Sequence, residues 1–148
     1  MFKIITFLSF MFFTFCANAE ITGFWTTIDD KTGKEKSVVE IYEYQGKFFG
    51  RVVDIFGNKE ATAKLRNNPK IMGLDIIWNL EKQGHEYKNG SILDPQKGKV
   101  YACEIWREGE NLIVRGKIAF LGRNQKWLKN TSFQKNDIKE LIPCVIKP

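Results

Sequence analysis

The chain has 148 residues, of which 43% are hydrophobic and 27% are charged, and its formal net charge is +6. This length suits a short leader and one globular domain. The excess basic residues are scattered along the chain, and this distribution argues against nucleic-acid binding. It favours a solvated basic surface, or a weak attraction to anionic lipid or cell-wall polymer. A single histidine and the lack of a CxxC pair argue against a zinc site, and no motif indicates a cofactor.

The N-terminus has the features of a secretory signal peptide. Lys3 precedes an apolar run at 4–15, and Ala17-Asn18-Ala19 supplies small residues at a cleavage site. The run is shorter than the roughly 20 residues that a spanning helix needs. A lipid anchor at Cys16 is the alternative, disfavoured by the bulky residue before it. We therefore expect residues 1–19 to be removed, leaving 20–148 as one periplasmic or secreted domain without a transmembrane segment.

Short runs rich in β-branched and aromatic residues recur between turn residues and predict strands. They cover residues 23–28, 37–44, 47–55, 71–81, 87–93, 99–107, 112–120 and 122–129. Gln45-Gly46 marks the clearest hairpin, and 94–98 reads as a turn. Segment 56–70 predicts a long loop with a helical turn at 60–65, of the kind that covers barrel mouths. A tail starts at about 131, with a short helix at 137–141.

About eight strands with short connections predict an all-β fold. Sequential hairpins favour an antiparallel up-and-down β-barrel, which leaves no free sheet edge, and a β-sandwich is the alternative. A barrel of this size either fills itself with side chains or holds one small ligand. The sequence pattern is the same in both cases.

Aromatic residues are the candidates for lining a cavity, although aromatic side chains also fill cores. The candidates are Tyr42, Trp78, Tyr101, Trp106 and Trp127. His85, the one imidazole, lies in a turn without a recognisable nucleophile or orienting partner. We therefore expect no catalytic residues, no metal and no enzymatic activity.

Two further pairs have alternative interpretations. Cys103 and Cys144 can form a disulfide that closes a loop of roughly 40 residues, which would stabilise the fold by about 4 kcal/mol. The alternative is that they are two unrelated thiols. Glu40 lies inside a strand, and if it is buried it needs a partner such as Arg51 or Arg115.

Several motifs run in order along the chain, beginning with Gly23-Phe24-Trp25. The others are residues 30–34, 38–42, 46–50, 69–74, 90–95, 98–103, 114–116 and 121–127. In these motifs the chain resembles a family of exported bacterial proteins known as domain of unknown function 2147. Many members carry two close cysteines before the Pro-x-x-x-Gly-Leu motif at 69–74, and this chain has none there. The resemblance implies a lipocalin-like barrel with no established activity.

In lipocalin-like barrels a tryptophan on the first strand plugs one end, and an arginine from the last strand packs across its indole. The resemblance assigns these roles to Trp25 and Arg123, with Arg115 as an alternative partner. Gly23 would allow close backbone approach where the strand enters. Such a cation–π contact is worth about 0.5–2 kcal/mol. We expect this group to close the barrel, so a binding site should lie at the opposite end.

These features favour a non-enzymatic carrier of a small apolar or amphipathic molecule. An envelope module that binds a protein or cell-wall polymer is the alternative. The sequence does not indicate an oligomeric state.

Overall fold

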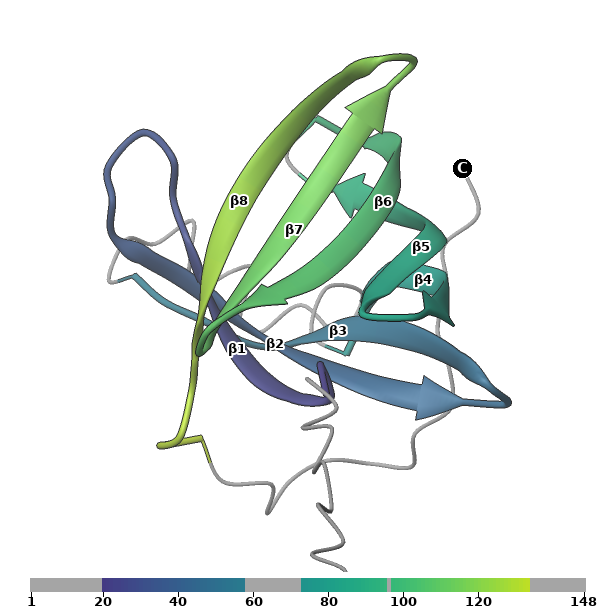
Figure 1. The fold of residues 1–148 in the computed structure, drawn as a ribbon. Helices are drawn as coiled ribbons and strands as arrows, with labels where there is room; N and C mark the ends of the chain where they lie inside the picture. Colours follow the sequence, from purple (N-terminus) through teal and green to yellow (C-terminus); the bar gives the residue numbers. More distant parts are fainter. Residues whose placement is uncertain (1–19, 58–72, 96, 134–148) are drawn as a thin grey trace, which may run out of the picture.

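The computed structural model describes residues 20–57, 73–95 and 97–133, and these form eight strands. The strands are β1 (Gly23–Ile28), β2 (Glu35–Tyr44), β3 (Lys47–Ile55), β4 (Asp75–Gln83), β5 (Glu86–Asp94), β6 (Lys99–Glu108), β7 (Asn111–Ile118) and β8 (Leu121–Lys129). Each strand pairs antiparallel with the next, and β1 pairs with β8 to close the barrel (Figure 1). The predicted all-β antiparallel barrel is confirmed, and the β-sandwich alternative is wrong.

Strand boundaries agree closely with the sequence pattern, with two informative differences. β1 and β3 span the predicted residues 23–28 and 47–55. β4 starts at Asp75, later than predicted, and β7 ends at Ile118 because Ala119 turns the chain with a φ of 52°. The predicted leader, most of the predicted 56–70 loop, and both predicted helical segments lie outside the described residues.

The up-and-down order divides the connections between two ends of the barrel. The β2–β3, β4–β5 and β6–β7 turns lie at the end where the chain enters β1, which we call the closed end. The β1–β2, β3–β4, β5–β6 and β7–β8 connections lie at the other end, which we call the open end.

Large side chains fill the barrel toward its closed end. They include Ile21, Trp25, Leu80, Tyr87, Ile105 and Leu112, each less than 2% exposed. Gly90 makes room for Leu80, because a Cβ at Gly90 would lie 2.5 Å from Leu80 Cδ2. Burial raises the pKa of Tyr87, as expected for a phenol packed in this core. Buried side chains of the described residues therefore pack this half of the interior.

Trp25 closes this end with an arginine that the sequence did not indicate. Its Nε1 donates to the carbonyl of Ile21 over 2.8 Å, and the guanidinium of Arg107 lies 5.0 Å from the ring centroid. Arg107 also donates to the carbonyls of Glu20 at 2.8 Å and Gly109 at 3.0 Å. Trp25, the strand entry and the β6–β7 turn are thus joined by one side chain.

The predicted partnership of Trp25 with Arg123 is wrong. Arg123 is the cross-strand partner of Gly116, near the open end of the barrel. The alternative partner, Arg115, lies against Gly122, where a Cβ would meet its guanidinium. A Cβ at Gly23 would meet no atom within 4 Å, so the φ of 131°, and not a close approach of another backbone, is what favours glycine there.

Candidate functional site: the open-end cavity

A cavity of about 540 Å³ occupies the half of the barrel nearest the open end. Val52, Ile76, Val114 and Trp127 line it and also belong to the hydrophobic core, so the top of the core forms the cavity floor. The upper wall adds Ile28, Ile55, Ile92, Leu93, Tyr101 and Gly116. Both the volume and the predominantly apolar lining are typical of small-molecule sites.

Polar groups gather at the rim of the cavity. Thr27 and Ser37, cross-strand neighbours on β1 and β2, share a hydrogen bond of 2.6 Å between their hydroxyl oxygens. In the β1–β2 loop, Asp29 accepts hydrogen bonds from the backbone N–H groups of Lys31 and Thr32. The N–H of Thr32, followed by that of Lys31, lowers the pKa of the Asp29 carboxyl below its usual value. These two hydrogen bonds stabilise the turn beside the mouth.

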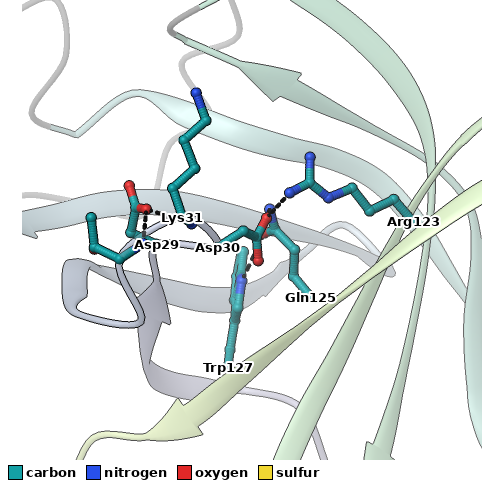
Figure 2. A network of polar contacts seen from close by, with 7 residues as sticks. Asp29, Asp30, Lys31, Arg123, Gln125 and Trp127 are labelled. Atoms are coloured by element: carbon teal, nitrogen blue, oxygen red, sulfur yellow. Dashed lines mark hydrogen bonds and ion pairs between the residues drawn. The ribbon is translucent and has the colours of Figure 1, made fainter.

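A chain of polar contacts joins this loop to β8 across one side of the mouth (Figure 2). Arg123 Nη2 donates to Asp30 Oδ2 over 2.5 Å, and Gln125 Nε2 donates to the same oxygen over 3.2 Å. The Oε1 of Gln125 accepts a hydrogen bond from Trp127 Nε1, also at 3.2 Å. The indole on the cavity floor and the exposed arginine on the rim are therefore linked through Gln125 and Asp30.

The predicted cavity-lining aromatics divide between the two faces of the barrel wall. Tyr101 and Trp127 line the cavity, as expected. Tyr42, Trp78 and Trp106 do not, because their cross-strand partners place them on the outer face. For these three residues the prediction is wrong.

Tyr42 instead belongs to a buried polar cluster on the outside of β2, β3 and β4. Its hydroxyl donates to Asp75 over 2.6 Å, and the guanidinium of Arg51 lies 5.2 Å from its ring centroid. Arg51 also pairs with Glu40 at 3.1 Å, as expected from the sequence for a buried Glu40. Burial and the neighbouring Asp75 raise the pKa of Tyr42. This cluster ties three strands together on the side of the wall away from the cavity.

Several residues that shape the cavity were not predicted from the sequence to line it. Val114 and Gly116 alternate on one face of β7, and Thr27 and Ser37 face them from β1 and β2. Their side chains are small, and small inward side chains are what leave the space empty. The period-2 alternation along β7 was the available signal.

Cys103 faces the barrel interior as a free thiol and is 1% exposed. Burial, with a smaller contribution from Glu104, raises its pKa. Cys144 lies outside the described residues, so the predicted disulfide gains no support here.

The described residues hold neither a metal-binding cluster nor a membrane-spanning helix. In residues 20–57, 73–95 and 97–133, no group of three or more histidine, cysteine or acidic side chains is placed to hold a metal ion. Within the same residues, no helix has the length and apolar character needed to cross a membrane.

Comparisons with known proteins agree with this architecture. A solved protein from the human pathogen Helicobacter pylori, described as belonging to the lipocalin family, is 24% identical and superimposes with a TM-score of 0.60. The match covers 77% of this chain and 85% of that one, and it shows that the two share a fold. No curated protein matches the chain. Residues 23–129 match the family of uncharacterized proteins conserved in bacteria known as DUF2147, and the chain belongs to that family.

Proposed function

We propose that this protein binds a small apolar or amphipathic molecule in the open-end cavity. The observation that carries the proposal is the 540 Å³ space itself, with an apolar floor and a rim of polar groups. Such a site accepts an apolar body and leaves a polar end at the mouth. The charged residues there are of both signs, namely Asp29, Asp30, Lys36, Asp94, Lys97 and Arg123. The gain comes from removing the apolar body of the ligand from water.

The arrangement of the chain's single histidine supports binding without catalysis. His85 lies in the β4–β5 turn at the closed end, on the opposite side of the solid core from the cavity. At the mouth, Arg123 and Gln125 both donate hydrogen bonds to Asp30, which braces the β1–β2 loop against β8. A nucleophile activated by a neighbouring base is the usual requirement of covalent catalysis, and the cavity residues named above form no such pair.

The proposed setting is the periplasm or the medium outside the cell. It rests on the leader-like residues 1–19 and on the match of the family to the part of the chain that follows. Recovery of the protein from an export-competent bacterial host, with its N-terminus read by mass spectrometry, tests this setting. The expected first residue is Glu20.

Binding is tested with N-phenyl-1-naphthylamine, an uncharged probe whose fluorescence rises in apolar sites. A Cβ at Gly116 would lie 3.7 Å from Tyr101 Cβ, which is ordinary contact, so Gly116→Leu adds volume inside the cavity without forcing the backbone. We expect this variant to weaken probe binding about tenfold or more.

Ala102→Leu is the matched control for this experiment. Ala102 is exposed and faces outward, as the cross-strand partner of Lys117 on β7. The control should bind the probe as the unmodified protein does. Equal binding by Gly116→Leu and the unmodified protein, both folded, would place the probe outside the cavity and refute the proposal.

A further inference from the structure

The largest exposed apolar side chains gather at the tip of the β7–β8 hairpin, which stands at the top of Figure 1. Phe120 is 88% exposed, Leu121 is 68% exposed and Ile118 is 59% exposed. Val100, 37% exposed, lies near the start of β6 at the same end of the barrel. Single exposed apolar residues are ordinary, but a cluster of them on one protruding tip indicates a contact surface.

The residues of the turn itself are not those that favour a tight hairpin. Ile118 pairs with Leu121, so the two-residue loop is Ala119-Phe120. Two-residue hairpin loops favour Asn-Gly or Gly because at least one residue has positive φ, and here Ala119 has a φ of 52°. Turn geometry therefore does not explain an exposed phenylalanine at this position.

The tip continues the apolar inner face of the cavity. Val114, Gly116 and Ile118 alternate on one face of β7, and the first two line the cavity. Leu121, the partner of Ile118, lies on that same face. Ile118 lies two positions beyond Gly116 along the strand, a rise of about 7 Å. The inner face of β7 is thus apolar from the cavity wall to the hairpin tip, with Arg123 of β8 beside Gly116.

Basic and acidic side chains both lie at this end of the barrel. Asp29, Asp30 and Asp94 line the mouth together with Lys36, Lys97 and Arg123, and Asp94 is the cross-strand partner of Lys99. Lys97 and Lys99, on and just after the β5–β6 turn, are exposed and form no ion pair with any residue in the described part of the chain. Arg123 and Lys117 flank the tip on β8 and β7, paired with Asp30 and Glu104 respectively. Exposed apolar residues flanked by lysine and arginine are the composition that binds the interface of anionic membranes.

We propose that the β7–β8 tip inserts into the surface of an anionic phospholipid bilayer and holds the cavity mouth against it. Phe120 and Leu121 enter the boundary between headgroups and acyl chains, while Lys97 and Lys99 contact lipid phosphates. Ile118 then connects the bilayer to the cavity wall, so an apolar molecule moves along this face without crossing water. The transfer of a ligand rests on the proposed function, whereas the docking of the tip does not.

Vesicle flotation tests the docking with protein exported and processed by its bacterial host. The vesicles contain phosphatidylcholine alone or with phosphatidylglycerol added. We expect binding to the anionic vesicles and a decrease as salt rises, because salt screens the contribution of the lysines. Phe120→Gln combined with Leu121→Gln should weaken binding at least about tenfold, because each side chain loses its apolar transfer energy.

Leu128→Gln is the matched control, since Leu128 is also exposed, at 40%, but pairs with Thr26 on β1 far from the tip. It should bind vesicles as the unmodified protein does. Thermal unfolding of each variant confirms that it is folded. A second test variant, Lys97→Gln with Lys99→Gln, should reduce the preference for anionic vesicles.

Three results would overturn the proposal. The first is equal vesicle binding by the Phe120 and Leu121 double variant and the unmodified protein. The second is no binding to anionic vesicles by a folded, unmodified protein. The third is a dimer in light scattering that the double variant abolishes, which would assign the tip to a second copy. Probe binding measured without vesicles reports on the cavity alone, so failure of docking is distinguishable from failure of the proposed function.

Discussion

Replacing Arg107 by alanine should destabilise the protein far more than replacing Arg123. Arg107 lies over the buried indole of Trp25 and donates hydrogen bonds to the carbonyls of Glu20 and Gly109. The cation–π contact is worth about 1 kcal/mol, and each hydrogen bond contributes a net of about 1 kcal/mol. We therefore expect Arg107→Ala to lower the free energy of unfolding by about 3 kcal/mol.

Arg123→Ala is the matched comparison. Its ion pair with Asp30 joins side chains that are 65% and 34% exposed, and surface pairs of this kind contribute about 0–1 kcal/mol. For a domain of this size, 1 kcal/mol shifts the melting temperature by about 4 °C. The melting temperatures of the two variants should thus differ by roughly 10 °C, and their free energies of unfolding in urea by about 2–3 kcal/mol. An Arg123→Ala variant that loses as much stability as Arg107→Ala would refute the assignment of Arg107 as the closing residue.

Two further predictions concern the interior. Gly90→Ala places a Cβ 2.5 Å from Leu80 Cδ2 and should lower the free energy of unfolding, measured in urea, by about 1–3 kcal/mol. In Gly116→Ala the new Cβ makes only ordinary contacts, so this free energy should change by less than about 0.5 kcal/mol. Equal losses in the two variants would contradict the packing described for Leu80. Burial raises the pKa of the Cys103 thiol. At mildly alkaline pH this thiol should therefore resist a thiol-specific reagent until urea unfolds the chain. A linked Cys103–Cys144 peptide under non-reducing conditions would contradict the assignment of Cys103 as a free thiol.

The strands could be predicted because their signals are local. Alternation, β-branched residues and turn residues locate β1 and β3 to the residue, and the sequential hairpins imply the closed meander. The sequence pattern places the β7–β8 turn too late because Ala119-Phe120 carries no turn signal, and its positive φ is visible only in the structure.

The face that each strand residue occupies could not be predicted as well. Both faces of β2 are buried, as neighbouring Val38 and Val39 show, so hydrophobicity alone does not place Tyr42. On β4, Asn79 takes a φ of 59° beside Trp78 and interrupts the simple alternation. The closing arginine depends on which end of the barrel each strand reaches, which is a long-range property of the register.

The seam between β1 and β8 has consequences for how the chain folds. Two residue pairs join these strands, Trp25 with Lys129 and Thr26 with Leu128, and the N–H of Asn130 donates to the carbonyl of Phe24 over 2.9 Å. Every other strand pair joins two strands that are consecutive in the sequence, whereas this seam joins the first strand to the last. Because closing so long a loop carries a large entropic cost, the seam should form late in folding, after the hairpins. Until β8 pairs with it, β1 presents an unpaired edge, and the partly folded chain is most prone to aggregate during that interval.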